Sequence, residues 1–263
     1  MAVRIGYDPT RRNRNIGTKA RGHGKDNSMS IPSVCSVERT WREQIGAYQV
    51  VEHQIAGRTV KFIIEKTRRK FLHACTPEAI CDVLSCLPPE DWTGLNCILL
   101  RQPTRKQSLV EPAWGRIVFA ANIGKAGKAD LYTGPAILLE ATDSSEELIW
   151  SRSLRPDLAD EFERLRRDGH TIIEERRGYR FILAEAAVRR TQLYRTLPHE
   201  IGHWVDWVNR VERPADLGGD YGALVDAYWA RPYSERESFA HRYAEAVIDW
   251  LPPKDRVGSI QST

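Results

Sequence analysis

The segment from Arg195 to Trp207 contains the motif H-E-x-x-H, formed by His199, Glu200 and His203. Residues four apart lie one turn apart on the same face of a helix, so both imidazoles could bind one metal ion. Glu200 lies beside that face, where its carboxylate could reach a water on the metal. With this composition the motif would arise by chance in about 1% of such chains, so it predicts a zinc site with Glu200 as the catalytic acid and base.

Two histidines leave such a site one ligand short, because catalytic zinc usually has three protein ligands and one open position. The further histidine of metzincins is absent, since Asp206 and Asn209 occupy the positions of its Gly-x-x-His extension. The best source is the segment 232–250, whose apolar residues recur at helical spacing. Glu237 lies on the mainly apolar stripe of this helix, where a carboxylate is costly unless it meets a cation. We therefore expect Glu237 to be the third metal ligand.

Other residues of this second helix compete for the same role. Ser234 and Glu237 also form a capping-box pattern, in which the glutamate would bond to the Ser234 amide instead of a metal. His241, one turn further along the stripe, is the next candidate, as a ligand or as a supporting group outside the ligands. Glu245 is the third.

The motif helix is expected to begin just before His199. Thr196 is a suitable N-cap, and Pro198 would fall in the first turn, where no backbone donor is needed. Apolar residues cover the other faces, as in a buried helix. The structural alternative is therefore a buried amphipathic helix whose two histidines only hydrogen-bond internally.

The rest of the chain predicts strands first and helices last, which is typical of an α+β fold with a mixed sheet. Two hairpins, three buried strands and two further helices are expected around polar loops. Their ranges are hairpins 48–55/59–65 and 171–174/179–183, strands 97–100, 117–120 and 136–139, polar loops 102–115 and 122–134, helices 77–86 and 156–167, and mostly helical structure over 184–251.

The net charge of +4 is unevenly distributed. Residues 1–30 carry +5 and the remaining chain carries −1. Residues 1–33 are polar and aperiodic, which predicts a flexible basic arm able to contact an acidic partner. We expect a single domain over 34–255, with 34–110 as a candidate subdomain, and a disordered tail over 256–263.

Composition also excludes several classes of protein. The amino terminus lacks the apolar stretch of a Sec signal, and no apolar run approaches the roughly 20 residues that span a bilayer. The five cysteines are odd in number and lack C-x-x-C spacing, so they are expected to be reduced thiols. These features predict a cytoplasmic protein without membrane contact, and they leave open export by a non-Sec route as an effector.

The two segments together resemble gluzincin metallopeptidases. The residues that carry the resemblance are His-Glu-Ile-Gly-His-Trp-Val-Asp, ending at Asp206, and Glu-Ser-Phe-Ala-His-Arg-Tyr-Ala, beginning at Glu237. The pattern is most similar to the catalytic domain of anthrax lethal factor and related bacterial cytosolic peptidases, over about residues 190–250.

The resemblance implies a zincin-like fold, in which the motif helix lies beneath a mixed sheet whose edge strand aligns the substrate. It implies zinc held by the two histidines and Glu237, with Asp206 as a supporting group outside the ligands. Such peptidases often use a tyrosine or histidine to stabilise the oxyanion, for which Tyr233 is our first candidate and Tyr228 and Tyr221 are the others.

The expected function is thus a zinc-dependent endopeptidase acting on a protein or peptide substrate. The alternative is a nucleic-acid or partner-binding module with a structural or vestigial metal site, tethered by the basic arm. Nucleic acid is the less favoured partner, because the body of the chain has no recognisable nucleic-acid-binding motif.

Overall fold

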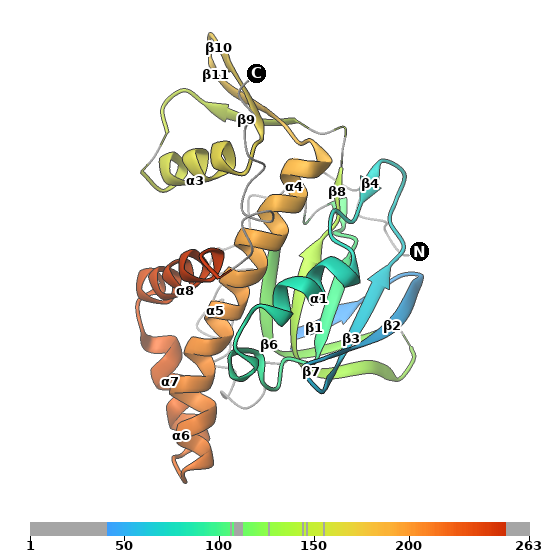
Figure 1. Ribbon diagram of the computed structural model, residues 1–263, viewed down its shortest axis with the longest axis vertical. Helices are drawn as coiled ribbons and strands as arrows, with labels where there is room; N and C mark the ends of the chain where they lie inside the picture. The colour runs from blue at the N-terminus through green and yellow to red at the C-terminus, as the bar shows by residue number, and fades with distance from the viewer. Residues whose placement is uncertain are drawn as a thin grey trace, which may run out of the picture. The chain divides into compact units, whose positions relative to one another are not determined.

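The structure of the chain is a computed structural model that describes residues 41–250 apart from 106, 108–112, 126, 144, 146 and 155. The side chains of 156 and 157 are also outside this description. The expected basic arm over 1–33, the tail over 256–263 and Cys35 therefore lie outside the described residues. The described part is α+β, as the sequence predicts (Figure 1).

A six-stranded mixed sheet forms the centre of the fold, in the order β1-β6-β7-β5-β3-β2. β3, β5 and β7 are mutually parallel, whereas β2 and β6 run antiparallel to their neighbours β3 and β7. The strand bounds are β1 Trp41–Gln44, β2 Tyr48–Ile55, β3 Arg58–Glu65, β5 Cys97–Arg101, β6 Gly115–Gly124 and β7 Asp130–Glu140.

The hairpin of β2 and β3 confirms the first expected turn. Ile55 pairs with Arg58, which leaves a two-residue loop of Ala56 and Gly57 with φ angles of 48° and 76°. Positive φ at both central positions is the geometry of a type I′ turn, whose twist matches that of the strands. Glycine adopts this conformation readily, which explains its place in the turn.

The two faces of the sheet are covered differently. On one face, residues such as Ile98 and Ile137 pack against α1 (Pro77–Ser85) and α5 (Leu197–Trp207). On the other face, alternate residues such as Leu99 and Leu138 form a second apolar cluster. This alternation follows from the two-residue period of a strand. As expected, Thr76 is the N-cap of α1, and its side chain accepts a hydrogen bond from the amide of Ala79.

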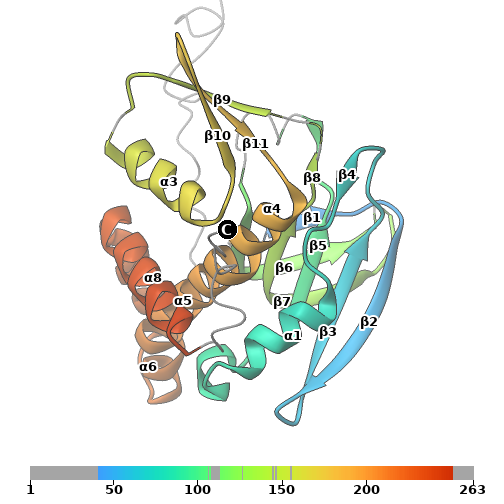
Figure 2. The same ribbon diagram turned by 45° about the horizontal axis from the view of Figure 1, so that its top comes forward.

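A smaller three-stranded sheet, β10-β11-β9, packs with α3 at one end of the described part of the chain (Figure 2). Phe162 and Leu165 of α3 contact the buried Phe181 of β11. The second expected hairpin and the helix over 156–167 are confirmed here. The bounds are β9 Glu147–Ser151, α3 Pro156–Arg167, β10 Thr171–Glu175 and β11 Gly178–Ile182. A two-stranded ladder, β4 (Phe71–Leu72) with β8 (Thr142–Asp143), completes the strands of the described residues.

The chain after Ala184 is mostly helical to Ile248, as predicted, with breaks at 217–220 and 231–232. Two π-helical turns interrupt it, η3 directly before α5 and η4 directly after it. None of the described helices is both long and apolar enough to cross a membrane. The bounds are α4 Glu185–Thr191, η3 Gln192–Thr196, α5 Leu197–Trp207, η4 Val208–Glu212, α6 Arg213–Asp216, α7 Tyr221–Ala230 and α8 Tyr233–Ile248.

Two local predictions are wrong. Thr196 is not an N-cap, because it has helical dihedrals of φ −67° and ψ −51° and makes no capping hydrogen bond. The chain instead runs from α4 through η3 into α5 without a break. The shifted hydrogen bonding of a π turn suits Pro198, which lacks a backbone donor. The polar loop expected over 122–134 is mostly strand, since Asn122 and Ile123 still pair with β7. The prediction failed because the polar residues at the ends of these two strands have the composition of a loop.

Candidate metal centre

Close contact between α5 and α8 brings the motif residues and Glu237 together. A Cβ atom on Gly202 of α5 would lie only 2.9 Å from the Cα of Ala240 on α8. Ala240 and Ala244 are both buried, so small residues on each helix let the two backbones approach. Glu237 lies one turn before Ala240 on α8 and therefore faces the histidines of α5.

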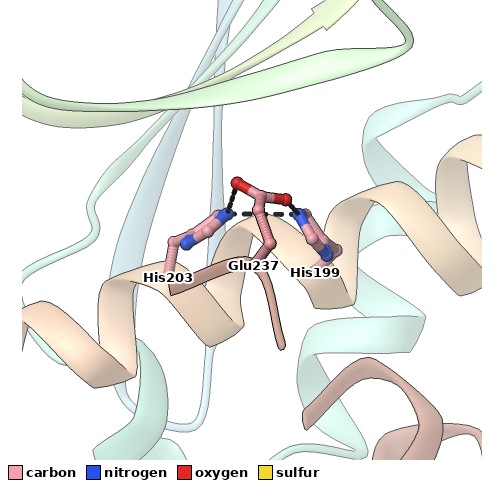
Figure 3. Close-up of side chains that lie close together, drawn as sticks. All are labelled: His199, His203 and Glu237. Atoms are coloured by element: carbon pink, nitrogen blue, oxygen red, sulfur yellow. Dashed lines mark hydrogen bonds and ion pairs between the residues drawn. The ribbon is translucent and has the colours of Figure 1, made fainter. Parts of the chain in front are cut away.

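The two histidines and Glu237, called here the metal triad, are the group of described residues whose ligand atoms could hold one metal ion. The Nε2 atoms of His199 and His203 lie 3.1 Å apart. The two carboxylate oxygens of Glu237 lie 3.3 Å from Nε2 of His199 and 3.4 Å from Nε2 of His203. Figure 3 shows the carboxylate lying across the two rings, whose nitrogens face one another.

These separations are short enough for one metal ion to bind all three side chains. One ligand atom from each residue lies within 4.8 Å of the others. The capping-box alternative for Glu237 is wrong, because α8 begins at Tyr233 after Pro232 and Ser234 is already inside the helix. The carboxylate is directed to the two histidines instead.

The electrostatics of the triad favour an ionised carboxylate on Glu237. Partial burial alone raises the pKa of Glu237, but the hydrogen bonds and positive charge of His199 and His203 outweigh it and hold the pKa well below its ordinary value. The triad therefore offers one anionic oxygen ligand and two imidazole nitrogens, a donor set that suits zinc.

Glu200 lies between the motif helix and the sheet. It is 8% exposed, and its Oε2 accepts a hydrogen bond of 2.7 Å from the amide of Ile117 on β6. β1 pairs with β6 only over Ala121–Gly124, so among the described residues no strand covers the outer edge of β6 around Ile117. The open edge of β6 thus faces the motif helix beside the triad.

Two features missed by sequence reasoning hold β6 over α5. Phe119 stacks on Trp207 at 4.5 Å between ring centroids and on Trp204 at 6.3 Å. Gln192, 1% exposed in η3, donates from Nε2 to the carbonyl oxygens of Trp114 (2.9 Å) and Glu140 (2.7 Å). These carbonyls end the β6–β7 ladder. The only signal in the sequence was a glutamine seven residues before His199, and it has no distinctive spacing.

The three tyrosine candidates lie in different environments. Tyr233 is 69% exposed at the start of α8. Burial of its hydroxyl end, followed by the charge and hydrogen bond of Glu237 and the charge of Glu200, raises the pKa of Tyr233. Tyr228 is buried among aromatic rings that include Phe119 and Trp207, and Tyr221 lies near Glu212. Only Tyr233 has the triad as its neighbour.

Asp206 does not contact the histidines in the way expected of a supporting group. Its carboxylate, 1% exposed, accepts hydrogen bonds from Arg210 at 2.8 Å and Arg231 at 2.6 Å. Arg231 lies two residues before the start of α8. Asp206 therefore joins α5 to the segment that leads into α8 and Glu237.

The remaining candidates fall outside the triad. The ring of His241 lies 4.5 Å from that of His199, and burial, followed by the charges of His199 and Arg164, lowers the pKa of His241 to about 4. Glu245 is exposed on α8. None of the described cysteines joins the triad.

Comparison with known proteins adds no relative to this site. No protein-family model matches the chain, and no curated protein or solved structure is significantly similar to it.

Proposed function

We propose that this protein is a zinc-dependent endopeptidase with a zincin-like arrangement. The observation that carries the proposal is the metal triad, in which one carboxylate faces two imidazole nitrogens at 3.3 Å and 3.4 Å. His199, His203 and Glu237 would hold the zinc. When bound, zinc is a Lewis acid that can polarise a carbonyl group and lower the pKa of a water molecule to about 7.

The open edge of β6 is the proposed binding site for the peptide backbone. An extended peptide can add a strand to an exposed sheet edge through main-chain hydrogen bonds. Gly115–Phe119 supplies such an edge next to Glu200. A peptide lying there would have its backbone beside the triad, which is the position that peptide-bond cleavage requires.

Glu200 and Tyr233 would carry out the proton transfer and polar stabilisation. Glu200 would accept a proton from the attacking water and return it to the leaving amine. Tyr233 would donate a hydrogen bond to the oxygen on which negative charge develops. The hydrogen bond from the Ile117 amide positions the Glu200 carboxylate in the free protein.

Metal analysis combined with a proteome-wide cleavage screen tests the proposal. We expect one zinc ion per chain and cleavage of peptide bonds that stops on chelation. Glu200→Gln should keep the zinc and lose nearly all turnover, because only the proton acceptor is removed. His203→Ala should lose both zinc and turnover.

Glu245→Gln is the matched control, since it changes an exposed carboxylate on the same helix as Glu237. It should keep both zinc and activity. Purified protein without stoichiometric zinc, or equal cleavage by the wild type and Glu200→Gln, would contradict the proposal.

A further inference from the structure

A cavity of about 500 Å³ lies where the main sheet meets the smaller sheet and α3. Its volume falls within the range of pockets that bind small molecules or side chains. The wall is largely aromatic and aliphatic. We call it the Trp114 pocket, and the wall residues used below are Phe71, Trp114, Trp150, Leu158, Arg116 and Glu140.

The Trp114 pocket is continuous with the open edge of β6. Trp114 and Arg116 line the pocket and alternate along the chain with Gly115, which lies close to Thr196 of η3, and Ile117, which bonds to Glu200 of the motif helix. Ile117 packs in the cluster on the α5 side of the sheet, whereas its neighbour Val118 packs on the other side. Arg116 therefore points to the face away from α5. A peptide added along this edge would direct alternate side chains to that face.

The polar end of the pocket has two buried atoms without hydrogen-bond partners. They are Oε2 of Glu140 and Nε of Arg116. Glu140 is 5% exposed, and its other oxygen, Oε1, accepts a hydrogen bond of 2.7 Å from Arg101. Nε of Arg116 lies 3.8 Å from that same Oε1, which is beyond hydrogen-bond distance. One acceptor and one donor are thus unsatisfied close together, which is costly in a buried site.

We propose that the Trp114 pocket binds a tyrosine side chain of the peptide substrate, an inference that rests on the proposed peptidase function. The ring would lie among Phe71, Trp114 and Trp150, whose faces and edges suit aromatic packing. The hydroxyl group is both a donor and an acceptor. It would donate to Glu140 and accept from Arg116, so one group satisfies both unpartnered atoms.

Other side chains match the pocket less well. Phenylalanine fills the apolar wall but leaves both polar atoms unpaired. Tryptophan only donates, and lysine would place a second positive charge beside Arg116. Glutamine could pair with both atoms but has no ring to pack against the aromatic wall.

Binding of small probes to the full-length protein tests the inference without requiring activity. N-acetyl-L-tyrosinamide, N-acetyl-L-phenylalaninamide and N-acetyl-L-lysinamide would be titrated and followed by saturation-transfer NMR. We expect the tyrosine probe to bind about tenfold more tightly than either of the others, the effect of one well-made polar contact. Equal or tighter binding of the phenylalanine or lysine probe would overturn the inference.

Two variants locate the site. Arg116→Met keeps the apolar stem and removes the donor, so the preference for tyrosine over phenylalanine should fall at least threefold. Leu158→Trp fills the pocket from α3 and should weaken both aromatic probes about tenfold. Arg42→Met, a change of an arginine outside the pocket, is the matched control and should alter neither. Unchanged probe binding in both pocket variants would contradict the assignment.

Metal content separates this test from the proposed function. The pocket contains no triad residue, so the tyrosine preference should be the same in zinc-loaded and chelator-treated protein. Absence of zinc would reject the peptidase and leave the probe result intact. Cleavage by the zinc-loaded enzyme, with no enrichment of tyrosine near the cleaved bonds and no probe preference, would reject the pocket and leave the peptidase standing.

Discussion

Two polar groups associated with the main sheet differ in how their charges are balanced. On the face away from α5, the Arg101 cluster pairs a 1% exposed guanidinium with two carboxylates at 2.7 Å each. Beside α5, the metal triad sets one carboxylate against two imidazoles at 3.3 Å and 3.4 Å. We define the Arg101 cluster by three residues, Glu43, Arg101 and Glu140.

The difference separates a group whose carboxylates already have a cation from one that leaves room for a metal ion. The Arg101 cluster contains its own cation, the guanidinium of Arg101. Arg116, whose Nε lies 3.8 Å from Glu140, adds a second positive charge. The triad contains acceptors that converge on one point and no permanent cation. Buried charges need a partner of opposite sign. The Arg101 cluster should therefore contribute to folding, whereas the triad should contribute to metal affinity.

Removing the cation of the Arg101 cluster should have the largest effect. Arg101→Met leaves Glu43 and Glu140 buried without their partner and should lower the free energy of unfolding by about 3–5 kcal/mol. Urea denaturation measures this. Arg42→Met, at a side chain that is 62% exposed, should cost less than about 0.5 kcal/mol. Similar losses in both variants would refute the contrast.

Removing the carboxylate of the triad should act mainly on the metal. We expect Glu237→Ala to weaken zinc binding by more than about a hundredfold. This is more than the loss usually seen when a residue that only supports a ligand is removed. Competition with a chromogenic chelator measures the affinity. The exposed Glu245→Ala on the same helix should leave it unchanged, and zinc affinity that survives the Glu237 change would show that the triad is not the site.

Widening the contact between α5 and α8 should weaken the triad without removing a ligand. In Gly202→Ala the new methyl group would meet the backbone of Ala240, which cannot move alone. We expect a loss of stability of about 1–3 kcal/mol and about tenfold weaker zinc binding. Ala246→Ser, on an exposed position of α8, is the control for helix propensity. Unchanged zinc affinity in Gly202→Ala would mean that close packing does not set the ligand geometry.

The smallest expected effect is a pH dependence of the metal-free protein. Because the pKa of His241 is lowered to about 4, the unfolded state takes up a proton near the ordinary value of about 6.5 that the folded state does not. Stability from this group is thus fully present above about pH 6.5 and is lost as pH falls towards 4. Thermal unfolding across this range should show a shallower slope for His241→Gln. An unchanged slope would assign the dependence to other groups.

Local sequence signals account for much of the fold. The I′ turn at Ala56 and Gly57, the cap at Thr76 and the helical period of 232–250 each depend on residues a few positions apart. The same holds for the spacing of His199 and His203. Thr196 shows the limit of such signals. It is a favourable N-cap residue, yet the helix continues through it by way of a π turn. Tertiary packing decides whether a helix starts or continues at such a residue.

The surroundings of the site depend on contacts far apart in the chain. Ile117 and Glu200 are 83 residues apart, and Gln192 reaches Glu140 across 52 residues. No periodicity encodes such pairs. For the same reason the Trp114 pocket, with walls from the main sheet, the smaller sheet and α3, has no counterpart in any motif.

The sequence by itself determined which functional groups are available: two imidazoles one helical turn apart, a carboxylate beside them and a second helix with a glutamate on its apolar stripe. Helix geometry is local, so four-residue spacing is enough to align His199 and His203. Tertiary structure decided that Glu237 meets them, because Gly202 and Ala240 must first bring two helix backbones together. It also placed Ile117 against Glu200, since strand pairing and helix packing, which act over long separations, fix that edge.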